Sequence, residues 1–554
     1  MSAQVGTAVE WNLIEKKGIV MKKFLMAIGI AALLTLSGCK TDEVFAQTPE
    51  VKSADVQVAP QVEVKPGDDL QAVLDSGEDL VLKSGCVYDI SETLVYKRAG
   101  QKIFTQDASY PSQFATLRIV NKKLLQLVNA GGVEGAVMEH VILDGQRYAL
   151  SIQPKLYING VAATEPSLAY FGAPGGDNQI VRECVFMNSR CWSTLKVHEG
   201  GRNELIENNF IFGAGGDCRG NGRELTEGRV KWGDGITFSA RESVVRNNLI
   251  IDPTDVGFVL FGSPGTIAES NVVASISRES LGGANLVDPI GYYKLSENET
   301  DYRGVKVRHN YVDAYGARIH VGYPVGAPIW SPKNQGKFLT GGEVTDNVMA
   351  GGAGGYGFVA HTIKGWKITG NKSTASYSGI ADGLSDTNRP HVPAAFVYNP
   401  ETVIDSELQD EFVKCNPHID HLLRCNHGPK DANGYRIYPY GDAEADAVVN
   451  AAYSEMLGRK ANEGELKENV ALLQSNTLNA DGVRRKVMAG TEFKTLYGEV
   501  APEDLHLYRT KLWFGICNTI IRDEGKWPSA RELYFKALRA LQMDKRAQLK
   551  IDRV

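Results

Sequence analysis

The feature that most constrains the fold of this 554-residue chain is a short phrase that recurs between residues 137 and 371. Each copy runs from an apolar residue through mostly polar ones to an asparagine, and apolar residues follow. Six copies carry the asparagine: Asn209, Asn248, Asn271, Asn310, Asn347 and Asn371. Two more copies place His140 and Cys184 in the same slot. The nearest copies lie about 22–25 residues apart, which indicates one structural repeat, and longer gaps indicate repeats with extra loop.

A repeat of this length built from β-prone segments predicts a solenoid, because one coil cannot bury its apolar face alone. An asparagine at each bend can bond to the asparagine one coil further on, so we expect the six asparagines to stack at one corner. The phrase resembles that of the right-handed parallel β-helix of the pectin-lyase-like superfamily, over about residues 66–400. The resemblance implies an all-β right-handed parallel β-helix (a solenoid) with a carbohydrate-related function, and it leaves the substrate open.

The composition supports a folded chain with more than one architecture. With 43% hydrophobic and 23% charged residues, a disordered or collagen-like chain is excluded. The net charge of −6 argues against a partner such as nucleic acid that is bound through bulk charge. Only 8 of the 58 glycines fall in residues 441–554, which indicates a second type of domain there.

Residues 441–554 predict an all-α helical domain. From Ala443 onward apolar residues recur at spacings of three and four, and further helices are expected near 463–475, 481–497, 502–522 and 528–548. Parts of the stretch 453–494 resemble a helical domain of unknown function that is appended to secreted bacterial proteins. The resemblance implies a role in docking or surface association; a plain helical bundle remains an alternative.

The N-terminal region reads as a targeting signal. Two lysines follow Met21, an apolar run of 13 residues covers 24–36, and Leu36-Ser37-Gly38-Cys39 resembles the lipobox of bacterial lipoproteins. The resemblance implies a signal peptide over 21–38, a lipidated Cys39, and location in the bacterial cell envelope, with Lys40 favouring the outer membrane. Residues 1–20 then read as a misassigned upstream start, and the polar, proline-containing segment 39–65 reads as a tether.

The connecting segment 401–440 contains a cluster of cysteines and histidines. Two cysteines and three histidines lie within 13 residues, namely Cys415, His418, His421, Cys425 and His427. An oxidising compartment favours a Cys415–Cys425 disulfide, and a zinc site is the alternative, although the spacing matches no common structural zinc pattern.

A second set of strands defines a candidate groove. We align the four-residue segments that begin at 195, 236, 258, 285, 318 and 358. Side chains alternate between the two faces of a strand, so one set points inward: Leu195, Val197, Ile236, Phe238, Phe258, Leu260, Leu286, Ile319, Val321, Phe358 and Ala360. The outward set is Lys196, His198, Thr237, Ser239, Val259, Phe261, Asn285, Val287, Arg318, His320, Val359 and His361.

The outward set is rich in groups that suit carbohydrate chemistry, with Asp234 and Asp255 expected at the mouth of the same face. Neighbouring coils lie about 4.8 Å apart, so groups on adjacent strands can act together. The candidate catalytic residues are Lys196, His198, Arg318, His320, Asp234 and Asp255. The candidate substrate-binding residues are Arg278, Asn285, Asp288, Tyr292, Tyr293, Tyr302 and His361.

These groups suit the β-elimination of a uronate polymer, and a polysaccharide lyase is the leading hypothesis. A cation neutralises the uronate carboxylate, a base removes the proton on C5, and an acid assists the departure of O4. We assign Arg318 as the neutraliser, Lys196 or His320 as the base, and a tyrosine within 292–302 as the acid. No metal site is predicted, although Ca²⁺ could also neutralise the carboxylate.

Two other classes of function remain open. A glycoside hydrolase or an epimerase would use a carboxylate pair, which Asp234, Asp255 and Asp288 could supply. A non-catalytic β-helix would bind glycan or mediate surface adhesion. The expected partners in all cases are a polysaccharide and, through the lipid, a membrane, and the protein is expected to be monomeric.

Overall fold

The computed structural model describes residues 60–150, 157–158, 161–162, 167–215, 232–288, 290–330, 332–379, 393–415, 419, 422, 440–475, 477–501 and 504–542. The signal peptide, Cys39 and the tether lie outside these residues, as do His418, His421, Cys425 and His427. In the described part of the chain, no helix is both long and apolar enough to cross a membrane.

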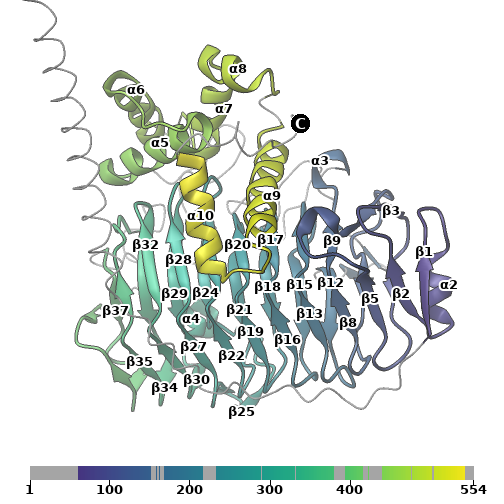
Figure 1. Cartoon of the computed structure of the whole chain (residues 1–554). Coiled ribbons are helices and arrows are strands. Elements are labelled where there is room, and N and C mark those ends of the chain that lie inside the picture. Colours follow the sequence, from purple (N-terminus) through teal and green to yellow (C-terminus); the bar gives the residue numbers. More distant parts are fainter. Residues whose placement is uncertain are drawn as a thin grey trace, which may run out of the picture. The chain divides into compact units, whose positions relative to one another are not determined.

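The body of the chain is a right-handed parallel β-helix, as the repeat predicts. Its coils contribute strands to three large sheets, A, B and C, in which every pairing is parallel (Figure 1). The strands of sheet A, in order, are β1 (Gln61–Val64), β2 (Asp79–Leu82), β5 (Lys102–Thr105), β8 (Val137–Glu139), β13 (Ile180–Arg182), β16 (Leu205–Glu207), β19 (Val244–Arg246), β22 (Ile267–Glu269), β27 (Lys306–Arg308), β31 (Glu343–Thr345), β35 (Lys367–Thr369) and β39 (Glu407–Leu408).

Sheets B and C complete the coils. Sheet B contains β3 (Val87–Ile90), β6 (Ala115–Ile119), β9 (Val141–Asp144), β14 (Val185–Met187), β17 (Phe210–Phe212), β20 (Leu249–Ile251), β23 (Val272–Ala274), β28 (Tyr311–Ala314), β32 (Val348–Gly351) and β36 (Lys372–Ser373). Sheet C contains β4 (Leu94–Val95), β7 (Val128–Asn129), β12 (Ser167–Gly172), β15 (Ser193–His198), β18 (Asp234–Phe238), β21 (Val256–Leu260), β24 (Ser280–Asn285), β29 (Ile319–Val325), β33 (Gly354–Ala360), β37 (Phe396–Tyr398) and β40 (Val413–Lys414).

Smaller elements decorate the coils. A fourth sheet contains β25 (Lys294–Ser296), β26 (Glu299–Asp301), β30 (Phe338–Thr340), β34 (Ile363–Lys364) and β38 (Val403–Ile404), and a hairpin pairs β10 (Tyr157–Ile158) with β11 (Val161–Ala162). The short helices are α2 (Leu70–Asp75), η1 (Pro111–Gln113), α3 (Arg147–Leu150), α4 (Ala327–Trp330) and η2 (Pro332–Asn334). Leu70 and Leu74 of α2 join the core, so this helix contributes to the first coils.

The six predicted asparagines form one continuous ladder between sheets A and B. The Nδ2 atom of each donates to the Oδ1 atom of the next, at 2.9–3.0 Å, from Asn209 through to Asn371. The backbone N–H of each asparagine also donates to the same Oδ1 atom of the next, as from Asn248 to Asn271 at 3.0 Å. The residue before each slot adopts a left-handed conformation, for example Asn208 with φ 56°. The hydrogen bonds at this corner satisfy buried amide groups, each of which would lower the folding stability by about 1–3 kcal/mol if it had no partner.

In one copy of the repeat, the predicted ladder position is wrong by one residue. Val137 pairs with Ile180, which places His140 beside Glu183, one residue before the ladder slot, and leaves Val141 in the slot itself. His140 has the positive φ of that preceding position, 55°, and its Nε2 atom lies 2.7 Å from Glu183 Oε2. Cys184 does occupy the slot, and its backbone N–H donates to Asn209 Oδ1 at 3.0 Å.

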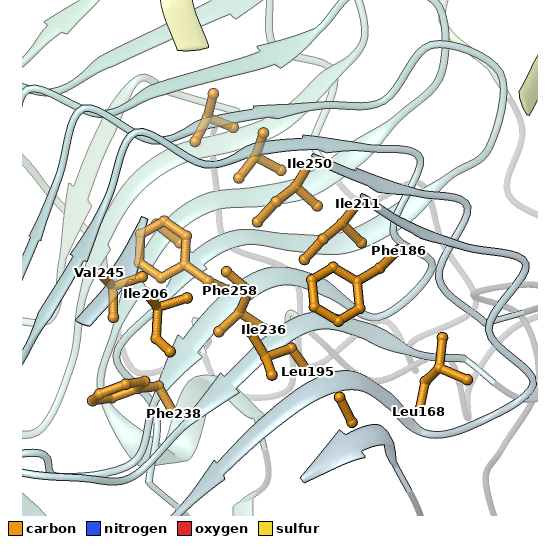
Figure 2. Close-up of a cluster of buried hydrophobic side chains, with 14 of the residues drawn as sticks. Leu168, Phe186, Leu195, Ile206, Ile211, Ile236, Phe238, Val245, Ile250 and Phe258 are labelled. Atoms are coloured by element: carbon orange, nitrogen blue, oxygen red, sulfur yellow. The ribbon is translucent and has the colours of Figure 1, made fainter. Parts of the chain in front are cut away.

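The main hydrophobic core fills the inside of the coils, and Figure 2 shows part of it. Leu195, Ile236, Phe238 and Phe258 are buried there, as the alternation of sheet C predicts (Figure 2). All the predicted inward residues belong to this core except Val321, which packs in a separate cluster on the outside. The glycines of sheet C also matter: Gly235 and Gly257 lie against core side chains, since an added Cβ would meet Ile250 and Val273 within 2.6 Å.

The C-terminal region is all-helical and packs on the β-helix. It comprises α5 (Asp442–Leu457), α6 (Glu463–Gln474), α7 (Ala480–Ala489), α8 (Thr491–Tyr497), α9 (Leu505–Glu524) and α10 (Ala530–Gln542). The single helix expected over 481–497 is two helices, because Gly490 adopts an extended conformation between them. Helix α10 lies against β20 and β23 of sheet B (Figure 1). Apolar residues of α9 and α10, including Trp513, Ile516 and Leu533, join outward residues of sheet B in one buried cluster.

Candidate functional site

The candidate site lies on the outer face of sheet C, where five strands place polar and apolar groups in one row. Parallel pairing aligns Tyr170, Lys196, Thr237, Val259 and Asn285 on β12, β15, β18, β21 and β24. Adjacent members are therefore about 4.8 Å apart in the backbone. Tyr170 and Lys196 begin this row, and His198 lies on the same face as Lys196, two residues further along β15.

His198 is the centre of a group of rings. Its ring centroid lies 5.6 Å from that of Tyr170 and 5.8 Å from that of Tyr292. Its Nδ1 atom lies 2.6 Å from Glu199 Oε2. The hydrogen-bond contact of Nδ1 is with the backbone carbonyl oxygen of Glu199, at 3.2 Å, which orients the imidazole and leaves Nε2 to exchange a proton with a ligand. About a quarter of the His198 side chain is exposed, so this group is accessible from solvent.

Tyr170 has the environment of a proton donor. Burial, and then the nearby Glu199 carboxylate, raise the pKa of Tyr170 above its ordinary value, so its hydroxyl stays protonated. Its ring lies over Gly131, where an added Cβ would meet Tyr170 Cε1 at 2.5 Å. Glycine at position 131 therefore makes the placement of this ring possible.

Lys196 is nearly buried and lies against an aromatic ring. Its Nζ atom is 5.5 Å from the centroid of Trp192, within the range of a cation–π contact. Trp232 and Trp330 also lie near this face, with ring centroids 6.3 Å apart. Tryptophan rings beside a cation are suited to stack on sugars, because a pyranose ring has apolar faces.

The two predicted carboxylates are not accessible. Asp234 and Asp255 are each 2% exposed. Asp234 Oδ2 accepts a hydrogen bond from Thr237 Oγ1 at 2.6 Å, and Thr237 Oγ1 lies 2.8 Å from Ser193 Oγ. Carboxylates that act as a glycosidase pair must reach the scissile bond, so this burial disfavours the hydrolase hypothesis.

The loop after β24 positions two tyrosines. Asp288, also 2% exposed, accepts from the backbone N–H groups of Ile290, Gly291 and Tyr292. This turn places Tyr292 beside His198. The hydroxyl of Tyr293 donates to Ser239 O at 2.7 Å and accepts from Gly200 N at 3.3 Å, so it fastens the loop to the coils.

Arg318 and His320 are buried against the helical region, which corrects the expectation that they are accessible on the outer face of sheet C. In the observed register Tyr323, rather than Arg318, pairs with Phe358, and Leu286 bridges Val325. The predicted alignment of β29 is therefore displaced by five residues. Arg318 is fully buried and forms a two-pronged ion pair with Glu444 of α5, at 2.7 and 2.8 Å.

His320 is buried in the same contact with the helical region. Its Nε2 atom lies 3.7 Å from Glu279 Oε2, and Glu279 accepts a hydrogen bond from Tyr440, whose ring lies 4.8 Å from the Arg318 guanidinium carbon. Burial lowers the pKa of His320, and the nearby Glu279 carboxylate opposes this change. These residues anchor the helices to the β-helix.

Other residues that were predicted to be exposed on this face are buried. Val259, Phe261, Val287 and Val359 belong to an outer apolar cluster with Ile329 of α4, so the middle of the row is covered. Tyr302 lies inside the main core and donates to Leu260 O. His361 is 3% exposed, and its Nδ1 atom lies 2.6 Å from Thr362 Oγ1.

Two further predicted residues have distinct surroundings. Arg278 lies away from this face, in a cavity beside α9, and donates to Gly215 O at 2.6 Å. Asn285 does lie in the row, 1% exposed, and its Oδ1 atom has no hydrogen-bond donor among the described residues.

Sequence reasoning missed Tyr170, Trp192 and Glu199. The segment Leu168-Ala169-Tyr170-Phe171 has the same alternation as the aligned strands and precedes them by one coil. Extending the alignment upstream would have found Tyr170. The other two residues adjoin the ends of β15, where no periodic pattern marks them.

Within the described ranges, no group of three or more His, Cys, Asp or Glu side chains is arranged to hold a metal ion. The disulfide and zinc hypotheses for residues 415–427 concern positions that are mostly outside those ranges.

Comparisons with known proteins give distant likenesses in structure. No family model matches this sequence, and no curated protein matches it. The A-module of the mannuronan C-5 epimerase AlgE6 of Azotobacter vinelandii is 14% identical, covering 61% of this chain and 94% of that one, with a TM-score of 0.33. An alginate lyase from Paenibacillus sp. str. FPU-7 is 11% identical, covering 57% and 97%, with a TM-score of 0.33. The tailspike protein of E. coli bacteriophage HK620 is 12% identical, covering 64% and 65%, with a TM-score of 0.41.

Proposed function

We propose that this protein is a polysaccharide lyase that cleaves an acidic, uronate-containing polysaccharide by β-elimination on the outer face of sheet C. The observation that carries the proposal is the convergence of a lysine, a histidine that lies beside a carboxylate, and a protonated tyrosine. Lys196 and Tyr170 are paired neighbours, and the ring of His198 lies 5.6 Å from that of Tyr170. The three groups supply the charge, the base and the acid that elimination requires.

The roles follow from the chemistry of each group. Lys196 pairs with the uronate carboxylate and makes the proton on C5 more acidic. His198, oriented by Glu199, accepts that proton while the C4–O4 bond breaks and a C4=C5 double bond forms. Tyr170 donates its proton to the departing O4, so atoms and electrons balance. The tryptophans beside Lys196 would hold the sugar rings.

The test is an activity screen on uronate-rich and neutral polysaccharides. Elimination creates an unsaturated uronate that absorbs in the ultraviolet, whereas hydrolysis creates reducing ends without new absorbance. Lys196→Met, His198→Gln and Tyr170→Phe should each lower kcat/KM about 10²–10⁴-fold with unchanged folding. Lys367→Met, at a half-exposed lysine of sheet A, is the matched control and should keep full activity.

The alternatives give different results. Reducing ends without absorbance, together with an inactive Asp234→Asn variant, would establish a glycoside hydrolase. Binding of a glycan with no product would establish the non-catalytic function. Full elimination activity in all three variants would refute the assignment of this face.

The envelope location belongs to the same proposal. We propose that Cys39 carries a lipid that anchors the protein to the bacterial membrane, because residues 21–39 have the order of a lipoprotein signal. A membrane-anchored lyase would act on polysaccharide at the cell envelope.

A further inference from the structure

The acid, the base and the cation proposed for elimination stand on one side of sheet C, and this placement limits which uronates they can cleave. Tyr170 on β12 pairs with Lys196 on the neighbouring strand β15 (Figure 1). The residues on either side of Tyr170 and of Lys196 belong to the main core, so both side chains point outward. His198 lies two residues beyond Lys196 and shares its face. All three groups therefore meet a bound sugar from the same direction.

The acid and the base are in contact with each other. The ring centroids of Tyr170 and His198 are 5.6 Å apart, and on its other side His198 contacts Tyr292 at 5.8 Å. A sugar inserted between two of these rings would need two layers of van der Waals contact, each about 3.5–4.0 Å thick, and the rings are too close for that. Tyr170, His198 and Tyr292 thus form one ring wall, and a pyranose lies against the wall.

The charges beside the ring wall orient the sugar. Nδ1 of His198 lies 3.2 Å from the backbone carbonyl oxygen of Glu199, which assigns the proton to Nδ1 and leaves Nε2 as the basic nitrogen. The Glu199 carboxylate repels a uronate carboxylate, whereas Lys196, about 6.6 Å back along the strand, attracts it. The uronate carboxylate is therefore directed toward Lys196, and the hydrogen on C5 toward His198.

Only some uronates can undergo elimination from one side. The base removes the hydrogen on C5 while the acid protonates O4, and each group must reach its own atom. When base and acid stand on the same side, that hydrogen and O4 must lie on the same face of the sugar ring. D-Glucuronate and D-mannuronate have this configuration. L-Guluronate, L-iduronate and D-galacturonate have the hydrogen and O4 on opposite faces.

We propose that this protein cleaves at D-glucuronate or D-mannuronate by syn elimination, and that the ring wall selects these sugars. The inference rests on the proposed lyase function and narrows its substrate class. His198 Nε2 takes the proton from C5, and the electron pair of the broken C–H bond forms the C4=C5 double bond. The C4–O4 bond breaks, and O4 takes the proton of Tyr170. The imidazolium then releases a proton to solvent and the phenolate takes one up, so atoms and charges balance.

The same placement separates this reaction from epimerisation at C5. An epimerase must return a proton to C5 on the face opposite to the one from which it was removed. The ring wall can return a proton only to the original face, which restores the original configuration. We therefore expect no guluronate in polymannuronate that is recovered after partial digestion, as measured by NMR.

The test compares polymannuronate with polyguluronate, whose sugars are epimers at C5, and glucuronan with polygalacturonate. Ultraviolet absorbance gives kcat/KM of the full chain on each polymer. Because a proton-transfer group that cannot reach its atom costs about 10²–10⁴-fold, the preferred syn polymer should be cleaved at least about 10²-fold faster than its counterpart. The faster of polymannuronate and glucuronan identifies the uronate. Tyr170→Phe should lower this ratio, and Lys367→Met, at a half-exposed lysine of sheet A, should keep it.

Several results would contradict the syn assignment. Faster elimination of polyguluronate or polygalacturonate would overturn it and leave the lyase function standing. An unchanged ratio in Tyr170→Phe would show that the ring wall does not set the preference, and guluronate in recovered polymannuronate would show a proton donor on the opposite face; each would overturn the inference. The absence of new absorbance with all four polymers would refute the lyase function itself, and the inference with it.

Discussion

The ion pair between Arg318 and Glu444 should control how firmly the helical region is held. Arg318 is fully buried, Glu444 is 2% exposed, and the two are joined by hydrogen bonds of 2.7 and 2.8 Å. Arg318→Ala would leave the carboxylate of Glu444 buried with only the weaker contacts of Ser378 Oγ at 3.1 Å and Gly441 N at 3.3 Å. Removal of one partner of a buried pair costs about 3–5 kcal/mol, and these remaining contacts place the cost at about 3 kcal/mol.

This cost should appear first in α5, because Glu444 belongs to its first turn. Amide hydrogen exchange within Asp442–Leu457 should become about 10²-fold faster, as about 3 kcal/mol corresponds to that factor. The double variant Arg318→Met with Glu444→Gln removes both charges together, and most of the protection should return. Exchange in sheet A is the internal control and should change little.

The result that would refute the reasoning is specific. If Arg318→Ala left α5 protected and the Tm unchanged but abolished turnover, Arg318 would be a catalytic group and the observed packing would not describe its role. If the single and double variants lost protection equally, the pair would contribute no coupling energy.

Three further predictions concern other parts of the chain. Burial raises the pKa of Asp313 from 3.8 to about 6 beside Tyr534 of α10, so the folded state holds this proton more tightly and stability falls as pH rises between these values, by up to about 3 kcal/mol. Asp313→Asn should therefore raise the Tm at pH 7 and leave it unchanged near pH 4, and a variant without gain at pH 7 would contradict the shift. Asn271→Ala should cost about 3 kcal/mol in denaturant unfolding, since Asn248 loses the acceptor of two hydrogen bonds, whereas Asn298→Ala at an exposed turn should be neutral. Cys39→Ser should move the protein from the membrane to the soluble fraction or block its processing, and unchanged membrane retention on fractionation would contradict lipidation.

The repeat made the fold predictable because its information is local. Each asparagine, the residue before it and the apolar neighbours specify one corner, and the inward residues of sheet C follow from alternation alone. The error at His140 came from a one-residue slip in a copy that has no asparagine to mark the slot.

The site was harder to predict because the register of strand pairing, and the segments that bury outward side chains, depend on residues far away in the sequence. Strand β29 has seven residues, and the segment that was aligned from Arg318 is five residues out of register, because Tyr323 pairs with Phe358. The covering of Val259 by α4 and of Arg318 by α5 involves segments up to 126 residues away in sequence. Alternation predicts which side chains point outward, and it cannot predict which of them another segment then buries.

The asparagine ladder also determines how this chain can change in length. Every side-chain amide donates toward the next coil in the same direction, and the bond is 2.9 Å long whether 39 residues separate the two asparagines, as for Asn209 and Asn248, or 23, as for Asn248 and Asn271. Extra residues between corners therefore leave the ladder intact, whereas one residue inserted inside the phrase would displace a donor from its acceptor. Insertions are tolerated in the loops, and the smallest segment that can be deleted or duplicated without breaking the ladder is a complete coil.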